Sequence, residues 1–172
     1  DDNVIRIAKG NVDKTVELEM ATPKSTVLQV YTAYMPIDTK TEVALDAAKY
    51  ILDIIYTKTI REDEGGTYGV GVAMAGTREP EERAIIQVSF STNPESAEKL
   101  SALAVKGLKE LAENGPAEDQ LNMAIENFKK NIPESRISNS YWAGAINSWY
   151  RFGIDSDAEY EEAVNTLTAE DV

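Results

Sequence analysis

The stretch TYGVGVAMAGTREPEERAIIQVSF, residues 67–90, decides the fold class of this chain. Bulky and small side chains alternate over residues 68–75, and a second alternating run covers residues 83–90. Strict alternation predicts β-strands, because successive side chains of a strand point to opposite faces of a sheet. The short connection between the runs makes them an antiparallel hairpin. One face of the first strand is nearly bare, so another segment can pack closely on it; this face carries Gly69, Gly71, Ala73 and Ala75.

A long helix is predicted directly before the hairpin. Apolar residues recur at helical spacing from Val43 to Ile55. They follow a Thr39-x-x-Glu42 pattern, which is typical of a capping box at a helix start. The helix can continue to about Arg61, which gives it a length of roughly 33 Å at 1.5 Å per residue.

Two further strands are predicted ahead of this helix. Residues 15–20 alternate polar side chains with Val16, Leu18 and Met20, which is the pattern of a half-buried strand. Residues 26–35 are apolar on both faces, as is typical of a central strand.

Helices follow the hairpin, and the order of elements predicts the architecture. Strands joined by hairpins rather than by long crossovers favour a mainly antiparallel sheet with helices packed on one face, an α+β fold. The expected helices run from Asn93 to Gly115, from Pro116 with a break or kink at Pro133, over residues 137–153, and over about residues 157–166.

The two ends suggest a piece of a longer protein. Residues 1–13 show no periodicity and are predicted to be a linker, with one domain over residues 14–172. The chain begins with Asp1, and Thr168-x-x-Asp171 has the form of a helix start, so we expect a domain truncated at its last helix. No apolar run approaches the ~18–20 residues that span a bilayer, so no membrane span is expected in this fragment.

The composition excludes several kinds of chemistry. The 172 residues include 17 Lys and Arg against 30 Asp and Glu, a net charge of -13, and neither histidine nor cysteine. Disulfides, thiol nucleophiles, Ser-His-Asp triads and the usual zinc sites are therefore absent from this chain. The acidity argues against nucleic acid and anionic membranes as partners, because both attract clustered Lys and Arg.

Three other patterns have simpler interpretations than a site. The acidic clusters are interpreted as solvated surface. The glycines of residues 65–76 lie between a helix and a strand and lack a Gly-Lys-Ser/Thr ending, so they form no phosphate loop. For the aromatic cluster, core packing is favoured and an interface with another domain is the alternative; it contains Tyr141, Trp142, Trp149, Tyr150 and Phe152.

Arg61 and Tyr68 form the most specific candidate site. Arg61 ends the long helix, Tyr68 begins the next strand, and glycines between them allow the chain to reverse tightly. A guanidinium and a phenol O–H are both donors, suited to a peptide carbonyl or a developing oxyanion. On spacing alone, the favoured alternative has Arg61 on terminal helix carbonyls and Tyr68 in the core.

Residues 59–73, TIREDEGGTYGVGVA, resemble the Leu-Arg-Glu-x-x-Gly-x-x-Tyr-x-Val stretch of the pitrilysin/insulinase zinc metallopeptidases, or inverzincins. The chain is most similar to the C-terminal inactive peptidase domain of the long bacterial zinc proteases of that family. The resemblance extends over most of the chain, including the order of elements and the Gly-Pro-x-Glu start at Gly115. It implies a metallopeptidase half-domain of the mitochondrial-processing-peptidase-like type.

The resemblance also implies a function. Two halves of such enzymes close around a peptide, and one half carries zinc on a His-x-x-Glu-His motif. The other half contributes an Arg and a Tyr, which map onto Arg61 for substrate binding and Tyr68 for substrate binding and transition-state support. No zinc ligand maps onto this chain, so zinc is expected in the missing half. The partners implied are that half and a peptide, with the bacterial periplasm or cell envelope as the compartment.

Two rival hypotheses remain open at this point. The parent protein could lack proteolytic activity and use this domain as a structural or assembly module. Alternatively, the chain could be a stand-alone acidic binding domain. For the enzyme hypothesis, the negative charge would favour basic or unfolded peptides through electrostatic steering.

Overall fold

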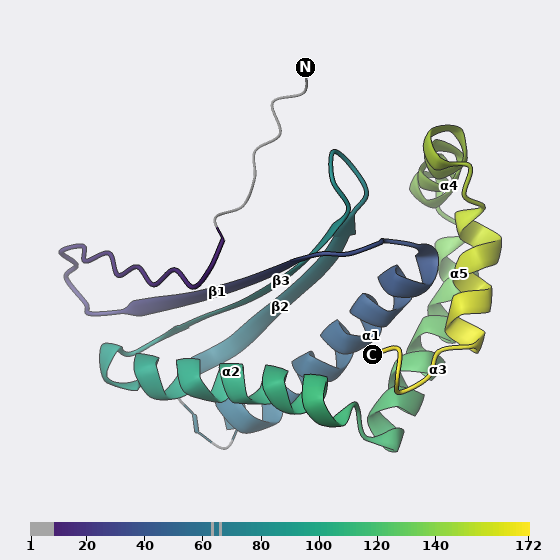
Figure 1. The fold of residues 1–172 in the computed structure, drawn as a ribbon. Helices are drawn as coiled ribbons and strands as arrows, with labels where there is room; N and C mark the ends of the chain where they lie inside the picture. Colours follow the sequence, from purple (N-terminus) through teal and green to yellow (C-terminus); the bar gives the residue numbers. More distant parts are fainter. Residues whose placement is uncertain (1–8, 63, 66) are drawn as a thin grey trace.

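An antiparallel sheet forms one layer of the computed structural model, which describes residues 9–62, 64, 65 and 67–172. Its strand order is β1-β3-β2, so the hairpin strand β3 is central. The prediction that residues 26–35 form a central strand is wrong: β1 lies at an edge, and Leu28 and Val30 on one of its faces are 58% and 53% exposed. Figure 1 shows helices α1 and α2 on the same face of this sheet. The predicted α+β architecture, a mainly antiparallel sheet with helices on one face, is confirmed. The elements of this part are β1 (Ser25–Tyr34), β2 (Thr67–Thr77), β3 (Arg83–Thr92), α1 (Thr39–Tyr56) and α2 (Ala97–Asn114).

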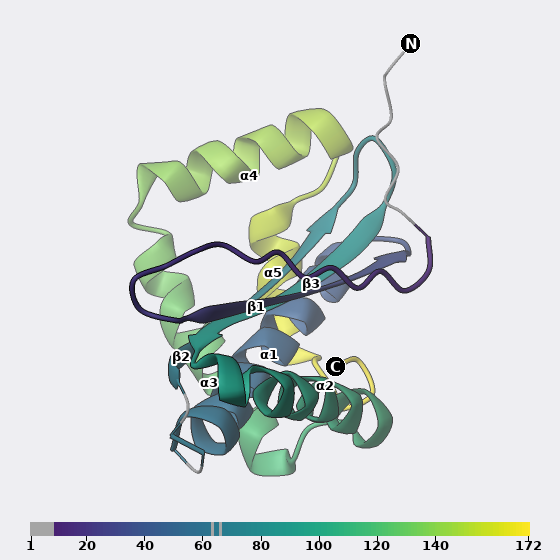
Figure 2. The ribbon, with the colours of Figure 1, turned by 90° about the vertical axis from the view of Figure 1, so that its left-hand side faces the viewer.

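A second group of helices lies beyond α1. Helices α3 and α5 pack against α1 on a side away from the sheet, and α4 lies across the end of this helical group (Figures 1 and 2). No described helix is both long and apolar enough to cross a bilayer. The remaining helices are η1 (Thr57–Glu62), η2 (Pro94–Ser96), α3 (Glu118–Ser135), α4 (Asn139–Phe152) and α5 (Ser156–Asn165).

Helix α1 is buried on two sides, and each side belongs to a separate apolar cluster. Its side toward the sheet contributes Ile51 and Leu52, which are both 0% exposed, to a cluster with β2, β3 and α2. Its N-terminal half contributes Val43 and Ala47, on an adjacent side, to a cluster with α3 and α5. The broad apolar stripe of the sequence is therefore the contact of one helix with two layers.

Helices α1 and α2 meet most closely at Tyr56. This side chain is completely buried, and its hydroxyl donates a hydrogen bond of 2.7 Å to the carbonyl oxygen of Ala104. Burial raises the pKa of the Tyr56 phenol above its ordinary value. Gly107 of α2 faces the same ring, and a Cβ added there would lie 2.7 Å from Cε1 of Tyr56. Only glycine allows the two helices to approach this closely.

Gly107→Ala is expected to destabilise the fold. The added methyl group would overlap a buried ring that cannot move without breaking its hydrogen bond, so we expect a loss of about 1–3 kcal/mol in the free energy of unfolding. The matched control is Gly144→Ala in α4, where an added Cβ meets nothing within 4 Å. Helix propensity predicts that this control is up to about 1 kcal/mol more stable than the wild type. Urea unfolding measures both, and equal effects of the two substitutions would contradict the packing argument.

The strand predicted over residues 15–20 is wrong. The segment runs beside β1 (Figures 1 and 2), but it has no strand pairing. The side chains of Val16, Leu18 and Met20 are 79%, 78% and 55% exposed. A sequence that alternates polar and apolar residues forms a half-buried strand only where another layer covers its apolar side chains. Helices α1 and α2 cover the other face of the sheet, so they do not cover the side chains of residues 15–20.

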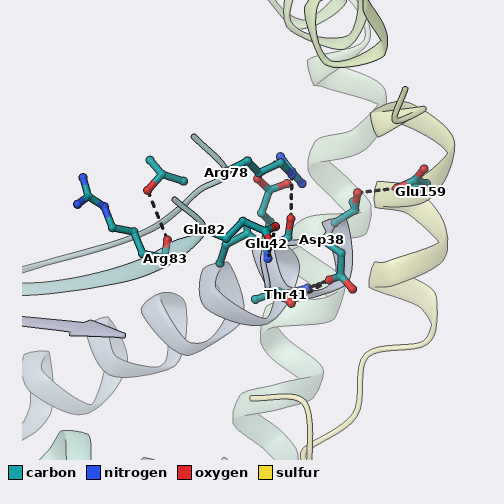
Figure 3. Close-up of polar contacts among 10 residues, drawn as sticks. Asp38, Thr41, Glu42, Arg78, Glu82, Arg83 and Glu159 are labelled. Carbon is teal, nitrogen blue, oxygen red and sulfur yellow. Dashed lines mark hydrogen bonds and ion pairs between the residues drawn. The ribbon is translucent and has the colours of Figure 1, made fainter. Parts of the chain in front are cut away.

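The start of α1 differs from the predicted capping box. Asp38 is the N-cap, and its Oδ1 accepts a hydrogen bond of 2.7 Å from the backbone N–H of Thr41. Thr39 and Glu42 are used instead to join other elements to α1: the Thr39 hydroxyl donates to Glu159 of α5, and Glu42 pairs with Arg78 of the β2–β3 connection (Figure 3).

The later helices follow the prediction apart from two details. Pro133 does not break α3, which continues two residues further to Ser135. The aromatic residues of α4 are not core: α4 has no buried residue, and Trp149 and Tyr150 are 58% and 84% exposed. At the C-terminal end, Asp171 accepts hydrogen bonds from the backbone N–H and the hydroxyl of Thr168, within a turn.

Asp157 of α5 holds α4 against the helical layer. Its carboxylate accepts a hydrogen bond of 2.8 Å from Nε of Arg136 and another from the hydroxyl of Tyr141. Hydrogen bonding to Arg136, and secondarily to Tyr141, lowers the pKa of the Asp157 carboxyl below its ordinary value. The charged carboxylate is therefore favoured in the folded state.

Asp157→Asn is expected to destabilise the fold at neutral pH and much less in acid. Because the folded-state pKa is lowered, the contribution of the carboxylate is present above the unfolded value of about 3.9 and is lost as the pH falls through the folded value. The difference in unfolding free energy between wild type and variant should shrink between pH 7 and pH 3. Asp13→Asn, at an exposed carboxylate with no partner among the described residues, is the control. A difference that stays constant with pH would exclude this role.

Candidate functional site

Arg61 is exposed at the end of the long helix. Helix α1 continues into η1, a π-helical turn in which Ile60 is 0% exposed. Ile60 belongs to the apolar cluster between the sheet and α1, so it anchors the turn from inside. The next residue, Arg61, is turned to solvent and has no hydrogen-bonding or ionic partner among the described residues. The predicted alternative, in which Arg61 caps helix carbonyls, therefore has no hydrogen bond to support it.

Among the described residues of the connection from Arg61 to Tyr68, Gly65 has a backbone conformation that favours glycine. Gly65 has a φ angle of +61°, in the left-handed region. Glu64 beside it forms an ion pair with Lys99 of α2, which ties the connection to the helical layer. Asp63 and Gly66, which belong to the acidic and glycine patterns of this segment, lie outside the described residues.

Tyr68 is completely exposed at the start of β2. Its side chain is 100% exposed, so the alternative in which Tyr68 fills the core is wrong. A register irregularity between Thr67 and Val70 interrupts the β2–β3 ladder at this point. Thr67 is held by a hydrogen bond of 2.7 Å from its hydroxyl to the carbonyl oxygen of Ser91. The ladder thus resumes at Val70, and Tyr68 is left outside it, with its phenol free among the described residues.

A groove crosses the end of the sheet at Tyr68. It consists of two cavities of about 510 and 340 Å³. The two cavities share the lining residues Lys24, Thr67, Tyr68 and Ser91, so they adjoin one another. They lie over the ends of β1, β2 and β3, because the rest of the lining of the second cavity consists of Thr26, Gly69, Ser89 and Phe90. We call this feature the Tyr68 groove.

The structure treats the two predicted site residues differently. Tyr68 lines both cavities of the groove, whereas Arg61 lines neither. Both side chains are exposed, and η1 packs against β2, so they belong to the same region of the molecule. The sequence interpretation missed Lys24, which no helix or strand pattern includes. Its position between Pro23 and the start of β1 was the only available signal.

The described residues offer no metal site. The chain has no histidine or cysteine, and no group of three or more carboxylates in the described part could hold a metal ion. Carboxylate oxygens alone would in any case be poor zinc ligands compared with His and Cys. The residues present therefore do not fit a catalytic zinc, and the chemistry that the site can supply is hydrogen-bond donation.

Gly65→Ala is expected to strain the connection that leads to Tyr68. A residue with a Cβ costs about 1–2 kcal/mol in the left-handed region, so the free energy of unfolding should fall by about that amount. Gly69→Ala is the matched control, because an added Cβ there meets nothing within 4 Å and its φ angle is not positive. Chemical denaturation compares the two variants. If Gly65→Ala were as stable as Gly69→Ala, the connection would not depend on this backbone conformation.

Comparisons with known proteins give a consistent family and fold. A family model described as the peptidase M16 inactive domain matches residues 6–128. A comparison with curated protein sequences finds no significant match. The family match agrees with the resemblance to the pitrilysin/insulinase zinc peptidases.

Three solved structures show how this fold occurs elsewhere. The periplasmic protease PqqL from Escherichia coli matches with a TM-score of 0.76 and 22% identity over 88% of this chain and 17% of its own. A peptidase M16 inactive domain from Pseudomonas fluorescens matches with a TM-score of 0.68 and 21% identity over 87% of this chain and 36% of its own. The inactive peptidase domain of a candidate zinc protease from Bordetella parapertussis matches at 0.68 and 13% identity, over 87% of this chain and 81% of its own. The chain thus spans only 17% and 36% of the length of the first two.

Proposed function

The chain belongs to the M16 peptidase family, as an inactive peptidase domain, and on that premise we propose that it is the non-catalytic half of a zinc-dependent endopeptidase. In this role it completes a peptide-binding chamber with the zinc-bearing half of the same protein. The zinc belongs to that other half, because the residues of this chain do not fit a zinc site. Alone, the chain neither binds catalytic zinc nor cleaves peptides. A neighbour described as a periplasmic protease favours the periplasm or cell envelope as the compartment.

One observation carries the proposal: a tyrosine whose hydroxyl has no partner among the described residues is fully exposed in an open groove. A tyrosine is large and partly apolar, and 100% exposure of its side chain leaves that apolar surface uncovered. Such exposure is explained if the ring faces a substrate and a second domain. Within the chamber, the Tyr68 hydroxyl would donate a hydrogen bond to the oxyanion that develops when the scissile carbonyl is attacked. Arg61 would hold the peptide backbone beside it.

Tyr68→Phe is expected to slow catalysis by the full-length protein. The hydroxyl would act mainly in the transition state, so kcat should fall by about 100-fold or more. KM should change by no more than about threefold, because the ring that contacts the bound peptide is retained. Hydrolysis of a quenched fluorescent peptide measures both constants.

Tyr34→Phe is the matched control for this experiment. Tyr34 is an exposed tyrosine of the same sheet, at 52% exposure, and lies at the other end of β1 from the groove. This control should hydrolyse the peptide at the wild-type rate. An unchanged kcat for Tyr68→Phe would remove Tyr68 from the mechanism. A full-length protein without hydrolytic activity would instead favour a structural or assembly module.

A further inference from the structure

Among the residues that the structure describes, none that lines the Tyr68 groove is a carboxylate, although the chain contains 30 acidic residues. Carboxylates do line other cavities of the described part: Asp38 and Asp171 face the cavity between α1 and α2, and Glu159 and Glu162 face another beside α5. The charged side chain among the described lining residues is Lys24, which lines both cavities, so this part of the lining has the opposite sign to the net charge of the whole molecule.

Donors in the groove are available to a ligand. Lys24, Tyr68 and Thr22 have no hydrogen-bonding or ionic partner among the described residues. Thr67, in contrast, already donates to the carbonyl oxygen of Ser91 and accepts from the N–H of Gly69. An ammonium and a phenol O–H that point to the same groove are both suited to a carboxylate oxygen.

Two acidic residues directly precede lining residues of the groove, and neither is itself in the described lining. Glu64 precedes Gly65, and its carboxylate is paired with Lys99 of α2. Glu19 precedes Met20 and is exposed, with no ion pair among the described residues. More distant carboxylates act through water and salt, and their field is largely screened beyond about 8 Å at physiological ionic strength. The side chains that touch a ligand therefore decide its preference more than the net charge of -13 does.

We propose that the Tyr68 groove binds an extended peptide through a carboxylate, which pairs with Lys24. The inference rests on the proposed function and adds a substrate feature to it: the preferred peptide segment carries an acidic group where it passes Lys24. This preference is opposite to the one for basic peptides that the net charge suggests. The carboxylate can belong to a Glu or Asp side chain or to the C-terminus of the peptide.

The test uses the purified chain and four labelled peptides of one extended, uncharged sequence. One carries a central Glu with both ends blocked, and the second and third replace that Glu by Gln and by Lys. The fourth has the central Gln and a free C-terminal carboxylate. Fluorescence anisotropy at physiological salt should show the Glu peptide binding about fivefold more tightly than the Gln peptide, as an exposed charge pair allows. Equally tight binding of the fourth peptide would show that a C-terminal carboxylate serves as well as a side chain, whereas binding as weak as that of the Gln peptide would assign the preference to the side chain.

Lys24→Glu and Lys14→Glu form a matched pair of variants. Both make the same change in net charge, but Lys14 lies outside the groove lining on the same exposed segment. Lys24→Glu should abolish the preference for the carboxylate, and Lys14→Glu should retain it within about twofold. Circular dichroism confirms that both remain folded, as expected for exposed side chains.

Three results would overturn the inference. These are equal binding of the Glu, Gln and Lys peptides, tighter binding of the Lys peptide, and the absence of binding by any peptide. Equal loss of preference in both lysine variants would also overturn it, because net charge would then be the cause. The proposed function is judged separately: a slow Tyr68→Phe enzyme would support the chamber role even if the peptides bound equally well.

Discussion

The packing of Tyr56 against Gly107 is the contact on which the arrangement of this domain depends. It sets the distance between α1 and α2, and both helices cover the same face of the sheet. Since α1 also carries the cluster with α3 and α5, its position fixes the second helical group as well. A helix buried on two sides has little freedom to shift, because close-packed interiors transmit small displacements.

The rigidity of α1 continues to the candidate site through η1. Ile60 lies in the same cluster as Tyr56, only one residue before Arg61. On the other side of the connection, the Thr67 hydroxyl fastens the start of β2 to the backbone of Ser91. The exposed Arg61 therefore directly follows the buried Ile60, and the exposed Tyr68 directly follows Thr67, which is fixed by its hydrogen bond. Sites built in this way keep their geometry without burying the groups that must meet a ligand.

Hydrophobic periodicity correctly predicted those elements whose apolar side chains pack against another layer of the structure. The hairpin of β2 and β3 and the long helix α1 are in this class, because their patterns reflect real burial. The pattern failed at residues 15–20, where Val16 and Leu18 alternate with polar residues but no layer covers them. It also failed for the aromatic residues of α4, which are exposed. A sequence pattern shows that a segment has an apolar side, whereas the tertiary structure decides what, if anything, lies against it.

The candidate site shows that net charge has the same limit as periodicity: it does not reveal which groups lie around a particular site. The sequence identified Arg61 and Tyr68 through their spacing, but it could not show that Tyr68 lines a groove and that Arg61 does not. Nor could it find Lys24, because a single lysine beside a proline carries no periodicity. Net charge is a sum over the whole surface, while a ligand meets only the groups within a few ångströms of it. An acidic protein can therefore present a locally cationic groove, and the preference of its peptide ligand follows from the lining rather than from the sum.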